Sequence, residues 1–463
     1  MSDRTRYDAI IVGAGQAGVP LARALANAGH YTAIVEREHI GGTCVNEGCT
    51  PTKTMVASGR VAYLVKRAAD YGVEVGSVSI DMKKIRERKR AIVQEWRSGN
   101  EESLKASKKL DILMGAAQFS GPKTLEVALN DGGKRELSAD LIFINVGLRP
   151  SIPQIEGLDQ IDYLTSTSIM ELDRVPEHLA VLGGGYIGLE FAQLFRRLGS
   201  RVTILQRGGQ LLPREDLDIA QALTEILRED GIDVRLNSQV KQVAKQQNAI
   251  ELEVHREGKQ ERLVASHVLV ATGRRPNSDS LRLELAGIEC DDKGFIKVND
   301  RLETSCQGVY ALGDVHGGPA FTHISYDDFR IIRANLIEGK QASIKDRLLP
   351  YTVFTDPQLG RVGLSEQEAR QRGYKIRVAS LPMSRVARAR EVDESRGLMK
   401  AVVDAESEQI LGAAVLGIEG GELASALQLA MMGKLPYSAL RDGVFSHPTL
   451  SEAFNNLFSA MEA

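Results

Sequence analysis

The stretch YDAIIVGAGQAG runs from Tyr7 to Gly18 and points to a nucleotide-binding fold. An apolar strand pattern ends at Val12 and meets three glycines spaced as G-x-G-x-x-G, after which a helical pattern begins. Glycines at this spacing allow a tight turn and bring a helix N-terminus close to a pyrophosphate. Glu36 lies 18 residues beyond Gly18, where a carboxylate can accept a hydrogen bond from a ribose hydroxyl. The stretch therefore predicts a dinucleotide-binding βαβ unit.

The same pattern recurs in the middle of the chain. The strand pattern of His178–Leu182 runs into GGGYIG, at residues 183–188, and a second strand pattern covers Arg201–Leu205. A lone glycine motif is weak evidence, but a recurrence in the same strand, turn and helix context is hard to explain by chance. The chain is therefore predicted to bind two dinucleotides.

The two copies differ at the position that contacts the ribose. Where the first has Glu36, the second has Gln206, followed by Arg207 and, a little further along, Arg214. An acidic residue would repel a 2′-phosphate, whereas glutamine and arginine would not. We therefore assign the first site to a flavin dinucleotide and the second to a nicotinamide, with NADPH favoured over NADH. The alternative for both arginines is a solvated surface.

A second, shorter repeat predicts where the chain passes between domains. The sequence LIFINVGLRP, residues 141–150, is echoed by VLVATGRRP, residues 268–276. Each is a buried-strand pattern stopped by glycine and proline. The nicotinamide domain is thus expected as an insertion between them. After the second crossing, another apolar strand ends at Gly313-Asp314, where Asp314 either caps a helix or hydrogen-bonds the ribityl chain of a flavin.

Two cysteines stand close together in GGTCVNEGCTPTK, residues 41–53. Five steps of a regular helix cover about 7.5 Å, beyond the roughly 6.8 Å limit between the Cα atoms of a disulfide. Cys44 and Cys49 could therefore pair only in a distorted turn, which Gly48 and Pro51 permit. Helix N–H groups and the charge of Lys53 are expected to lower a thiol pKa there. Two structural cysteines or half of a metal site are the alternatives, although zinc ligands usually have a shorter spacing and a second pair.

The C-terminal part changes character from about Leu348 onward. Strand patterns at residues 399–403 and 410–416 precede an apolar helical stretch at residues 423–434. The sequence FSHPTLSE follows at residues 445–452. Thr449 and Glu452 have the spacing of a helix capping box, so His447 is either structural or catalytic.

Overall composition excludes several classes of protein. A length of 463 residues predicts about three domains at roughly 150 residues each. The formal net charge of -3 gives no general attraction for nucleic acid or anionic membranes, and the basic run at residues 83–90 is interpreted as a solvated helix face. Four cysteines are too few for a disulfide scaffold, and neither a signal peptide nor a membrane span is recognised. We expect a soluble, cytoplasmic protein with small-molecule partners.

Together these segments resemble the class I pyridine nucleotide–disulfide oxidoreductases, a family that includes dihydrolipoamide dehydrogenase, glutathione reductase and mercuric reductase. The resemblance covers essentially the whole chain and is specific, because a GGTC-x4-C-x-P-[ST]-K block and a terminal HPT-x2-E block rarely coincide. It implies an α/β fold with two Rossmann-like dinucleotide-binding domains and an α+β C-terminal dimerisation domain. The expected boundaries are 1–147 with 276–345 for FAD, 148–275 for NAD(P), and 346–463 for dimerisation.

The resemblance also implies a path for electrons. Hydride would pass from nicotinamide to the flavin and then to a redox-active Cys44–Cys49 disulfide. Cys49 would be the flavin-side, charge-transfer thiolate, and Cys44 the interchange thiol that meets the substrate. Lys53 would sit at the reactive edge of the flavin and pair with Glu190.

A further implication is an active site shared between two subunits. His447, coming from the other subunit, would be the acid–base for the interchange thiol and would be oriented by Glu452, which makes the protein an obligate homodimer. Tyr186 would gate the nicotinamide pocket. The expected FAD-binding residues are Gly13, Gly15, Gly18, Glu36, Gly42, Thr43, Lys53, Gly115, Gly147, Gly313 and Asp314. The expected NAD(P)-binding residues are Gly183, Gly185, Tyr186, Gly188, Gln206, Arg207 and Gly273; no resident metal is expected.

The electron acceptor is left open by this resemblance. The segment 313–330 looks closest to the mercuric-reductase-like branch, but the tail after Glu452 lacks that enzyme's extra cysteine pair. We therefore expect a flavoprotein that reduces a disulfide or a metal ion, acting on a sulfur group or metal-ion acceptor. The alternatives are a dihydrolipoamide dehydrogenase, which runs from a dithiol to NAD inside a multienzyme complex, and a non-catalytic flavoprotein scaffold. The retained dithiol and His447 argue against the scaffold.

Overall fold

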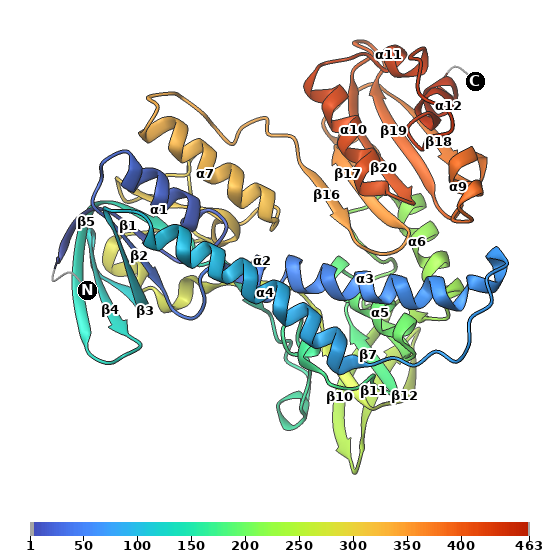
Figure 1. The fold of residues 1–463 in the computed structure, drawn as a ribbon, viewed down its shortest axis with the longest axis horizontal. Coiled ribbons are helices and arrows are strands. Elements are labelled where there is room, and N and C mark those ends of the chain that lie inside the picture. The colour runs from blue at the N-terminus through green and yellow to red at the C-terminus, as the bar shows by residue number, and fades with distance from the viewer. Residues whose placement is uncertain (1–3, 462–463) are drawn as a thin grey trace. The chain divides into compact units, whose positions relative to one another are not determined.

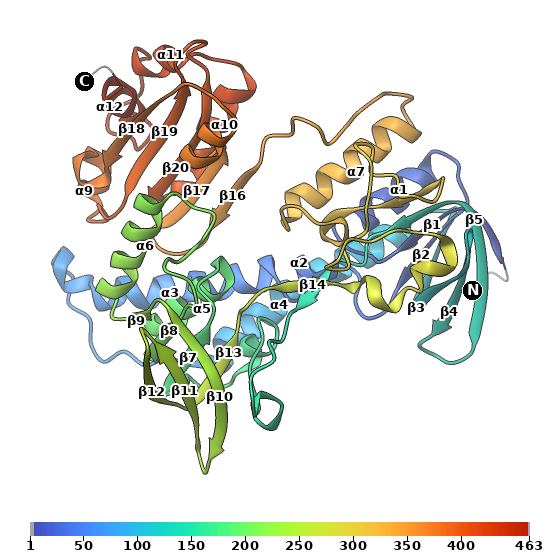
Figure 2. The ribbon, with the colours of Figure 1, turned by 180° about the vertical axis from the view of Figure 1, so that it is seen from behind.

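The computed structural model describes residues 4–461 and divides into two compact units (Figures 1 and 2). The first takes in the chain up to Thr54, then Lys84–Ser151 and Gly273–Arg347. The second takes in Met55–Lys83, Ile152–Thr272 and the chain from Leu348 onward. Each unit is thus assembled from stretches that are distant in sequence.

The first unit is built on a mixed sheet with a parallel centre. Strand β1 lies between β2 and β5, parallel to both, and β15 continues the sheet beside β5. On the other side β3 pairs parallel with β2, and β4 joins β3 to β5 by antiparallel pairing. The strands are β1 (Arg6–Val12), β2 (Thr32–Glu36), β3 (Leu110–Gly121), β4 (Thr124–Leu129), β5 (Lys134–Ile144) and β15 (Val309–Ala311).

Both faces of this sheet are covered, which explains why β1 is apolar and buried from Ala9 to Val12. Ile10 and Ile11 are fully buried in two different core clusters, because successive side chains of a strand point to opposite faces. The cluster around Ile11 includes side chains of α1 (Gly18–Asn27) and α7 (Thr322–Leu336), which lie side by side in Figures 1 and 2. The unit also contains α2 (Gly42–Asn46), the start of α3 (Cys49–Lys66) and most of α4 (Met82–Lys105). The basic run lies on α4 and is largely exposed, although Lys89 is buried.

The ends of the two copies of the short repeat, residues 141–150 and 268–276, pair with each other as two short strands. Strand β6 (Leu148–Pro150) runs antiparallel to β14 (Arg274–Pro276), and Arg149 stands opposite Arg275. The N–H of Ser151 also donates to the carbonyl of Gly273 at 2.9 Å. The chain therefore leaves and re-enters the first unit along two adjacent strands, as a pair of domain crossings requires.

The second unit contains the other dinucleotide-type sheet. Its four parallel strands lie in the order β13-β7-β8-β9, with α5 and α6 following β7 and β8 along the chain, beside an antiparallel sheet of β10, β11 and β12. The elements are β7 (His178–Leu182), α5 (Tyr186–Leu198), β8 (Arg201–Leu205), α6 (Leu217–Glu229), β9 (Asp233–Arg235), β10 (Ser238–Gln246), β11 (Ala249–Arg256), β12 (Lys259–Ala265) and β13 (His267–Val270).

The C-terminal part of this unit is a five-stranded antiparallel sheet with helices. Its order is β16-β17-β20-β19-β18, and α10 packs on β17 and β20. The apolar stretch near the end forms α10 close to its expected position, and the strand patterns form β19 and β20. The elements are β16 (Pro350–Val353), β17 (Gln358–Gly363), α8 (Glu366–Gln371), β18 (Ile376–Pro382), α9 (Ala387–Glu391), β19 (Leu398–Asp404), β20 (Ile410–Gly417), α10 (Gly420–Met432), α11 (Tyr437–Arg441) and α12 (Ala453–Ser459).

Candidate functional site

The first glycine loop, between β1 and α1, has no room for a Cβ at its first and last glycines. Gly13 has φ +102°, and a Cβ there would lie 2.4 Å from the carbonyl oxygen of Asn145. A Cβ on Gly18 would lie 2.2 Å from the oxygen of Gly13. Glu36, at the end of β2, accepts a hydrogen bond from the N–H of Ala14 at 2.8 Å. A carboxylate offers about four acceptor positions, so this bond leaves capacity for a ribose hydroxyl.

The second loop, between β7 and α5, repeats this construction. A Cβ on Gly183, which has φ +111°, would lie 2.4 Å from the oxygen of Ala271, and one on Gly188 would lie 2.4 Å from the oxygen of Gly183. A Cβ on Gly185 would meet nothing within 4 Å, so the loop is open at this glycine, directly before α5. The N-terminus of a helix favours an anion. Gln206 Oε1 accepts from the N–H of Gly184 at 3.0 Å.

The dithiol segment is packed directly onto the first glycine loop. The N–H of Gly41 donates to the oxygen of Ala14 at 2.8 Å, and a Cβ on Gly42 would lie 2.6 Å from the Cα of Gly15. Cys44 lies on α2, whereas Cys49 begins α3, so the pair does not share one regular helix. The break between them is tight: a Cβ on Gly48 would lie 2.9 Å from the oxygen of Thr43. The segment that leads into both cysteines is therefore held against the first dinucleotide loop.

The two cysteines are free thiols whose titration is linked. A hydrogen bond to Cys49 raises the pKa of Cys44, and burial and the negative charge of a Cys49 thiolate raise it further. Thr322 and Lys53 act in the opposite direction but more weakly. The lowering expected for a thiol of this pair does not occur at Cys44, because two sulfurs that share one proton cannot both ionise easily. Cys44 therefore holds its proton more tightly than an ordinary cysteine does. For Cys49, which begins α3, the lowering stays a prediction.

A residue that the sequence did not single out touches the other sulfur. Thr322 is the first residue of α7, and its Oγ1 lies 3.2 Å from Cys49 Sγ. A hydroxyl at this distance can donate to a thiolate. No local motif marks Thr322, because the contact joins residues 273 positions apart.

Asp314 lies in the same unit, in a 3-10 helix formed by Gly313–His316. Its carboxylate faces Arg274 Nη1 at 3.8 Å, and burial raises the pKa of Asp314 although Arg274 and His316 oppose that shift. Among residues 4–461 no helix takes Asp314 as a side-chain N-cap. The capping alternative is therefore wrong, and the hydrogen bond to a flavin's ribityl chain stays a prediction.

His447 and Glu452 are brought together in the second unit. Nδ1 of His447 lies 2.9 and 3.0 Å from the two carboxylate oxygens of Glu452, and the imidazole is 68% exposed. The hydroxyl of Thr449 accepts from the N–H of Glu452 at 3.3 Å. No capping box forms here, because the N-cap of α12 is Glu452, not Thr449, and the carboxylate of Glu452 is bound to the imidazole. Within the described chain the full reciprocal box belongs to Ser365 and Glu368, at the start of α8.

The remaining expected site residues are distributed over both units. Lys53 lies in the first unit, whereas Glu190 and Tyr186 lie on α5 in the second, so the Lys53–Glu190 pair and the gating role stay predictions. Glu190 is buried, and its Oε1 accepts from the N–H of Phe354 at 2.8 Å. Gly147 and Gly273 have positive φ and open space where a Cβ would stand, whereas Gly115 is close-packed, since a Cβ there would lie 2.4 Å from the oxygen of Ala128.

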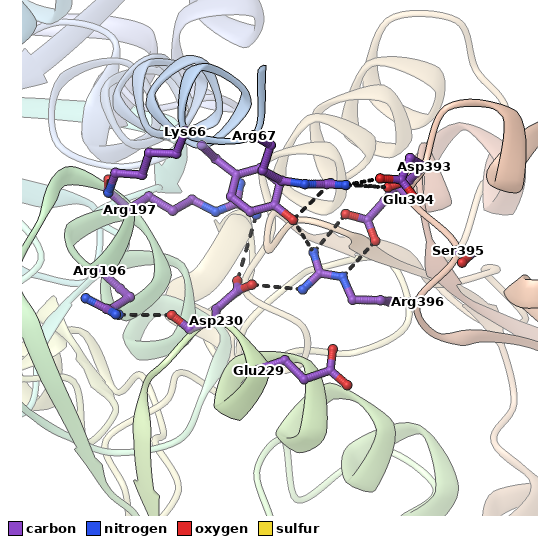
Figure 3. Close-up of a pocket in the computed structure, with 11 residues that line it drawn as sticks. Lys66, Arg67, Arg196, Arg197, Glu229, Asp230, Asp393, Glu394, Ser395 and Arg396 are labelled. Atoms are coloured by element: carbon purple, nitrogen blue, oxygen red, sulfur yellow. Dashed lines mark hydrogen bonds and ion pairs between the residues drawn. The ribbon is translucent and has the colours of Figure 1, made fainter. Parts of the chain in front are cut away.

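A separate cavity of about 460 Å³ lies in the second unit, where α3, α5 and α6 end (Figure 3). The cationic side chains that line the cavity are bound by other groups of the protein. Arg396 binds Asp230 at 2.8 Å and Glu394 at 2.7 Å, while Lys66 and Arg196 donate to main-chain carbonyls at helix ends, at 2.7 and 2.9 Å. Helix C-termini attract cations because their last carbonyls are unpaired. We therefore interpret the cavity as a structural junction.

Two further features are absent from residues 4–461. No helix in this range is long and apolar enough to cross a membrane. The same range contains no group of three or more histidine, cysteine, aspartate or glutamate side chains arranged to hold a metal ion.

Comparison with known proteins covers the whole chain. Residues 7–328 match the family model described as pyridine nucleotide-disulphide oxidoreductase, and residues 349–458 match the dimerisation domain of that family. The probable pyridine nucleotide-disulfide oxidoreductase RclA of Escherichia coli (strain K12) is 39% identical over 461 residues, covering 99% of this chain and 100% of the relative. A mercuric reductase of Lysinibacillus sphaericus is 35% identical over 96% of this chain and 81% of its own length.

Two further matches extend the comparison. A dihydrolipoyl dehydrogenase of Thermus scotoductus is 36% identical, covering 99% of this chain and 97% of the relative. The solved Cu(II) complex of the HOCl-induced flavoprotein disulfide reductase RclA from Escherichia coli superposes with a TM-score of 0.89 at 39% identity, covering 98% of this chain and 99% of that one. With the glycine loops, the dithiol and the fold, these matches show that the chain is an enzyme of the pyridine nucleotide–disulfide oxidoreductase family of flavoproteins.

Proposed function

We propose that this enzyme takes electrons from NADPH and passes them through FAD and the Cys44, Cys49 pair to a small disulfide or a metal ion. The observation that supports the proposal is the packing of Gly41 and Gly42, which lead into the cysteine pair, against the first glycine loop. For a disulfide the balance is NADPH, a proton and RSSR giving NADP⁺ and two RSH. For copper, NADPH and two Cu(II) give NADP⁺, a proton and two Cu(I).

The first unit fits a bound FAD. Its glycine turn can form only because Gly13 and Gly18 lack side chains. Glu36 has spare acceptor capacity, and the Asp314 carboxylate caps no helix. We assign Gly13, Gly15, Gly18, Glu36, Gly42, Thr43, Lys53, Gly115, Gly147, Gly313 and Asp314 to this cofactor. When bound, FAD would supply the hydride-accepting and electron-passing chemistry that side chains lack.

Within the dithiol, the two sulfurs have different tasks. Thr322 stabilises a thiolate at Cys49 by donating from Oγ1, and Lys53 adds positive charge nearby. Cys44 holds its proton, because its pKa is raised by Cys49 and by burial. An interchange thiol in this state needs a base before it can attack, since the thiolate is the nucleophile.

We assign that base to His447 of the partner subunit. The bond from Nδ1 to Glu452 fixes the ring and leaves Nε2 to take the proton. An imidazole that is 68% exposed in one chain is consistent with an active site completed by a second chain. The matched dimerisation domain supports a homodimer built in this way.

The preference for NADPH rests on the second loop. Gln206 occupies the position that Glu36 has in the first, and Arg207 and Arg214 are exposed nearby. A 2′-phosphate placed there would meet positive charge and no carboxylate at the acidic position. We assign Gly183, Gly185, Tyr186, Gly188, Gln206, Arg207 and Gly273 to the nicotinamide dinucleotide.

The acceptor separates two candidate functions. Likeness to the RclA structure solved with Cu(II) and to mercuric reductases favours a metal ion or a disulfide. The 36% identity to a dihydrolipoyl dehydrogenase favours the reverse direction, from a dihydrolipoamide dithiol to NAD⁺. An anaerobic panel of lipoamide, glutathione disulfide, Hg(II), Cu(II) and quinones, each with NADPH and NADH, decides between them.

The panel is read against a Cys44→Ser variant. We expect turnover with at least one disulfide or metal ion, faster with NADPH, and lost in Cys44→Ser. Activity that survives Cys44→Ser contradicts the proposed path through the dithiol. If the reduction of NAD⁺ by dihydrolipoamide is the one productive reaction, the enzyme is a dihydrolipoamide dehydrogenase instead.

A further inference from the structure

A fully buried carboxylate lies behind the Gly313–Asp314 segment. Asp328, on α7, has no solvent exposure and accepts three hydrogen bonds. Its Oδ2 accepts from the N–H of Gly313 at 2.8 Å and from Nε2 of His316 at 2.9 Å. Its Oδ1 accepts from Nη2 of Arg347 at 2.7 Å. A buried carboxylate is stable only with such donors, so Asp328 ties both ends of the 3-10 helix of Gly313–His316 to α7.

Helix α7 also reaches the redox sulfur. Thr322, at the start of α7, lies 3.2 Å from Cys49 Sγ. Asp328 follows six residues later, which is about 9 Å along a helix. The contact between α7 and the 3-10 helix is also tight, because a Cβ on Gly313 would lie 2.6 Å from the Oγ of Ser325. One rigid element therefore holds the Gly313–Asp314 segment at one point and Cys49 at another.

We propose that Asp328 is a positioning residue of the flavin site, which keeps Asp314 in register with Cys49 through α7. The inference rests on the proposed function, because it takes Asp314 as a flavin-binding group. Asp328 itself is assigned no contact with substrate or cofactor. It acts by fixing the main chain of Gly313 and the ring of His316, which border Asp314 on both sides.

The test compares two neighbouring carboxylates. Asp328→Asn replaces one acceptor oxygen with an NH₂ group, which cannot accept from the present donors. Asp327→Asn is the matched control, since Asp327 pairs with Arg347 Nε at 3.3 Å but is 35% exposed and takes no part in the bonds to Gly313 and His316. The measurements are the dissociation constant of FAD for the flavin-stripped protein and the long-wavelength thiolate–flavin absorbance of the NADPH-reduced holoenzyme.

For Asp328→Asn we expect FAD binding at least about tenfold weaker, equivalent to about 1.4 kcal/mol, and a smaller long-wavelength absorbance. For Asp327→Asn we expect both values within about threefold of the parent. Because Asp328→Asn also weakens the pairing of Arg347, His316→Ala serves as a second variant that leaves the Arg347 bond in place. All variants are measured at a temperature where circular dichroism shows them folded.

The outcomes separate this inference from the proposed function. If Asp328→Asn and His316→Ala both match Asp327→Asn in FAD affinity and absorbance, the positioning role is overturned. An Asp314→Ala variant tests the assignment beneath it. Unchanged FAD affinity in Asp314→Ala means that the flavin site is wrongly assigned, and the inference falls with it. If Asp314→Ala binds FAD more weakly while Asp328→Asn and His316→Ala bind it normally, the positioning role of Asp328 is rejected and the proposed flavin site stands.

Discussion

The side-chain oxygen of Gln206 accepts a hydrogen bond from the N–H of Gly184 at 3.0 Å, and this repeats the bond of Glu36 to Ala14 at 2.8 Å in the other dinucleotide loop. In each case a side chain at the end of the second strand holds the second residue of the glycine loop. The two loops thus differ in the charge of one side chain at a shared position. A single substitution at this position is therefore expected to change the preference between NADPH and NADH.

The variant Gln206→Glu is expected to reverse the preference between the two nicotinamide cofactors. The carboxylate keeps the bond to Gly184 but repels a 2′-phosphate, so KM for NADPH should rise about tenfold or more, a change of about 1.4 kcal/mol. Steady-state kinetics with both cofactors measure this. Arg207→Ala should raise KM for NADPH and leave KM for NADH unchanged; an equal effect on both would place Arg207 outside the phosphate site.

Removal of Cys49 is expected to lower the pKa of Cys44. The largest cause of the raised pKa is the hydrogen bond to Cys49, and the Cys49 charge adds to it. A raised pKa leaves Cys44 protonated at neutral pH, so Cys49→Ser should move the thiolate transition to lower pH, with burial still raising the pKa. The pH profile of alkylation by iodoacetamide, read by mass spectrometry at Cys44, measures the shift. Cys290→Ser is the control, and an unmoved Cys44 profile in Cys49→Ser contradicts the linkage.

Variants of Glu452 and Thr449 distinguish a catalytic role of the His447 segment from a role in helix capping. His447→Gln should lower kcat by about 10²–10⁴-fold, the usual contribution of a general acid–base. Glu452→Gln should also lower kcat, because it weakens the bond that orients the imidazole. Thr449→Val removes the hydroxyl that accepts from the N–H of Glu452 and should cost about 1 kcal/mol of stability with kcat preserved. Equal kinetic effects in Thr449→Val and Glu452→Gln would favour the capping interpretation.

A buried ion pair in the second unit is expected to dominate local stability. Arg361 binds Glu215 at 2.8 Å, and their side chains are 4% and 2% exposed. Glu215→Ala leaves the guanidinium buried without this partner and should lower the free energy of unfolding by about 3–5 kcal/mol. Chemical denaturation gives the value. Glu225→Ala, at an exposed position of the same helix α6 that follows Glu215, is the control and should change it by less than about 0.5 kcal/mol.

Much of this enzyme can be predicted from local sequence, because the relevant physics is local. The last glycine of each motif is required by a contact within one turn, since a Cβ on Gly18 or Gly188 would meet a carbonyl of the same loop, and the motifs therefore indicate their loops locally. The first glycine of each motif also makes room for a distant carbonyl, that of Asn145 or Ala271, which only the fold reveals. The repeat of a strand stopped by glycine and proline predicts the domain crossings, and the structure adds that β6 and β14 pair with each other.

Other features follow from tertiary structure alone. The contact between Thr322 and Cys49 spans 273 residues, and the bonds of Asp328 depend on how α7 packs against the Gly313–His316 turn. The raised pKa of Cys44 is likewise a result of packing, because the hydrogen bond to Cys49 and burial outweigh the charge of Lys53. Spacing along the chain specifies which backbone turns can form; the folded arrangement decides which distant side chains share a proton or a hydrogen bond.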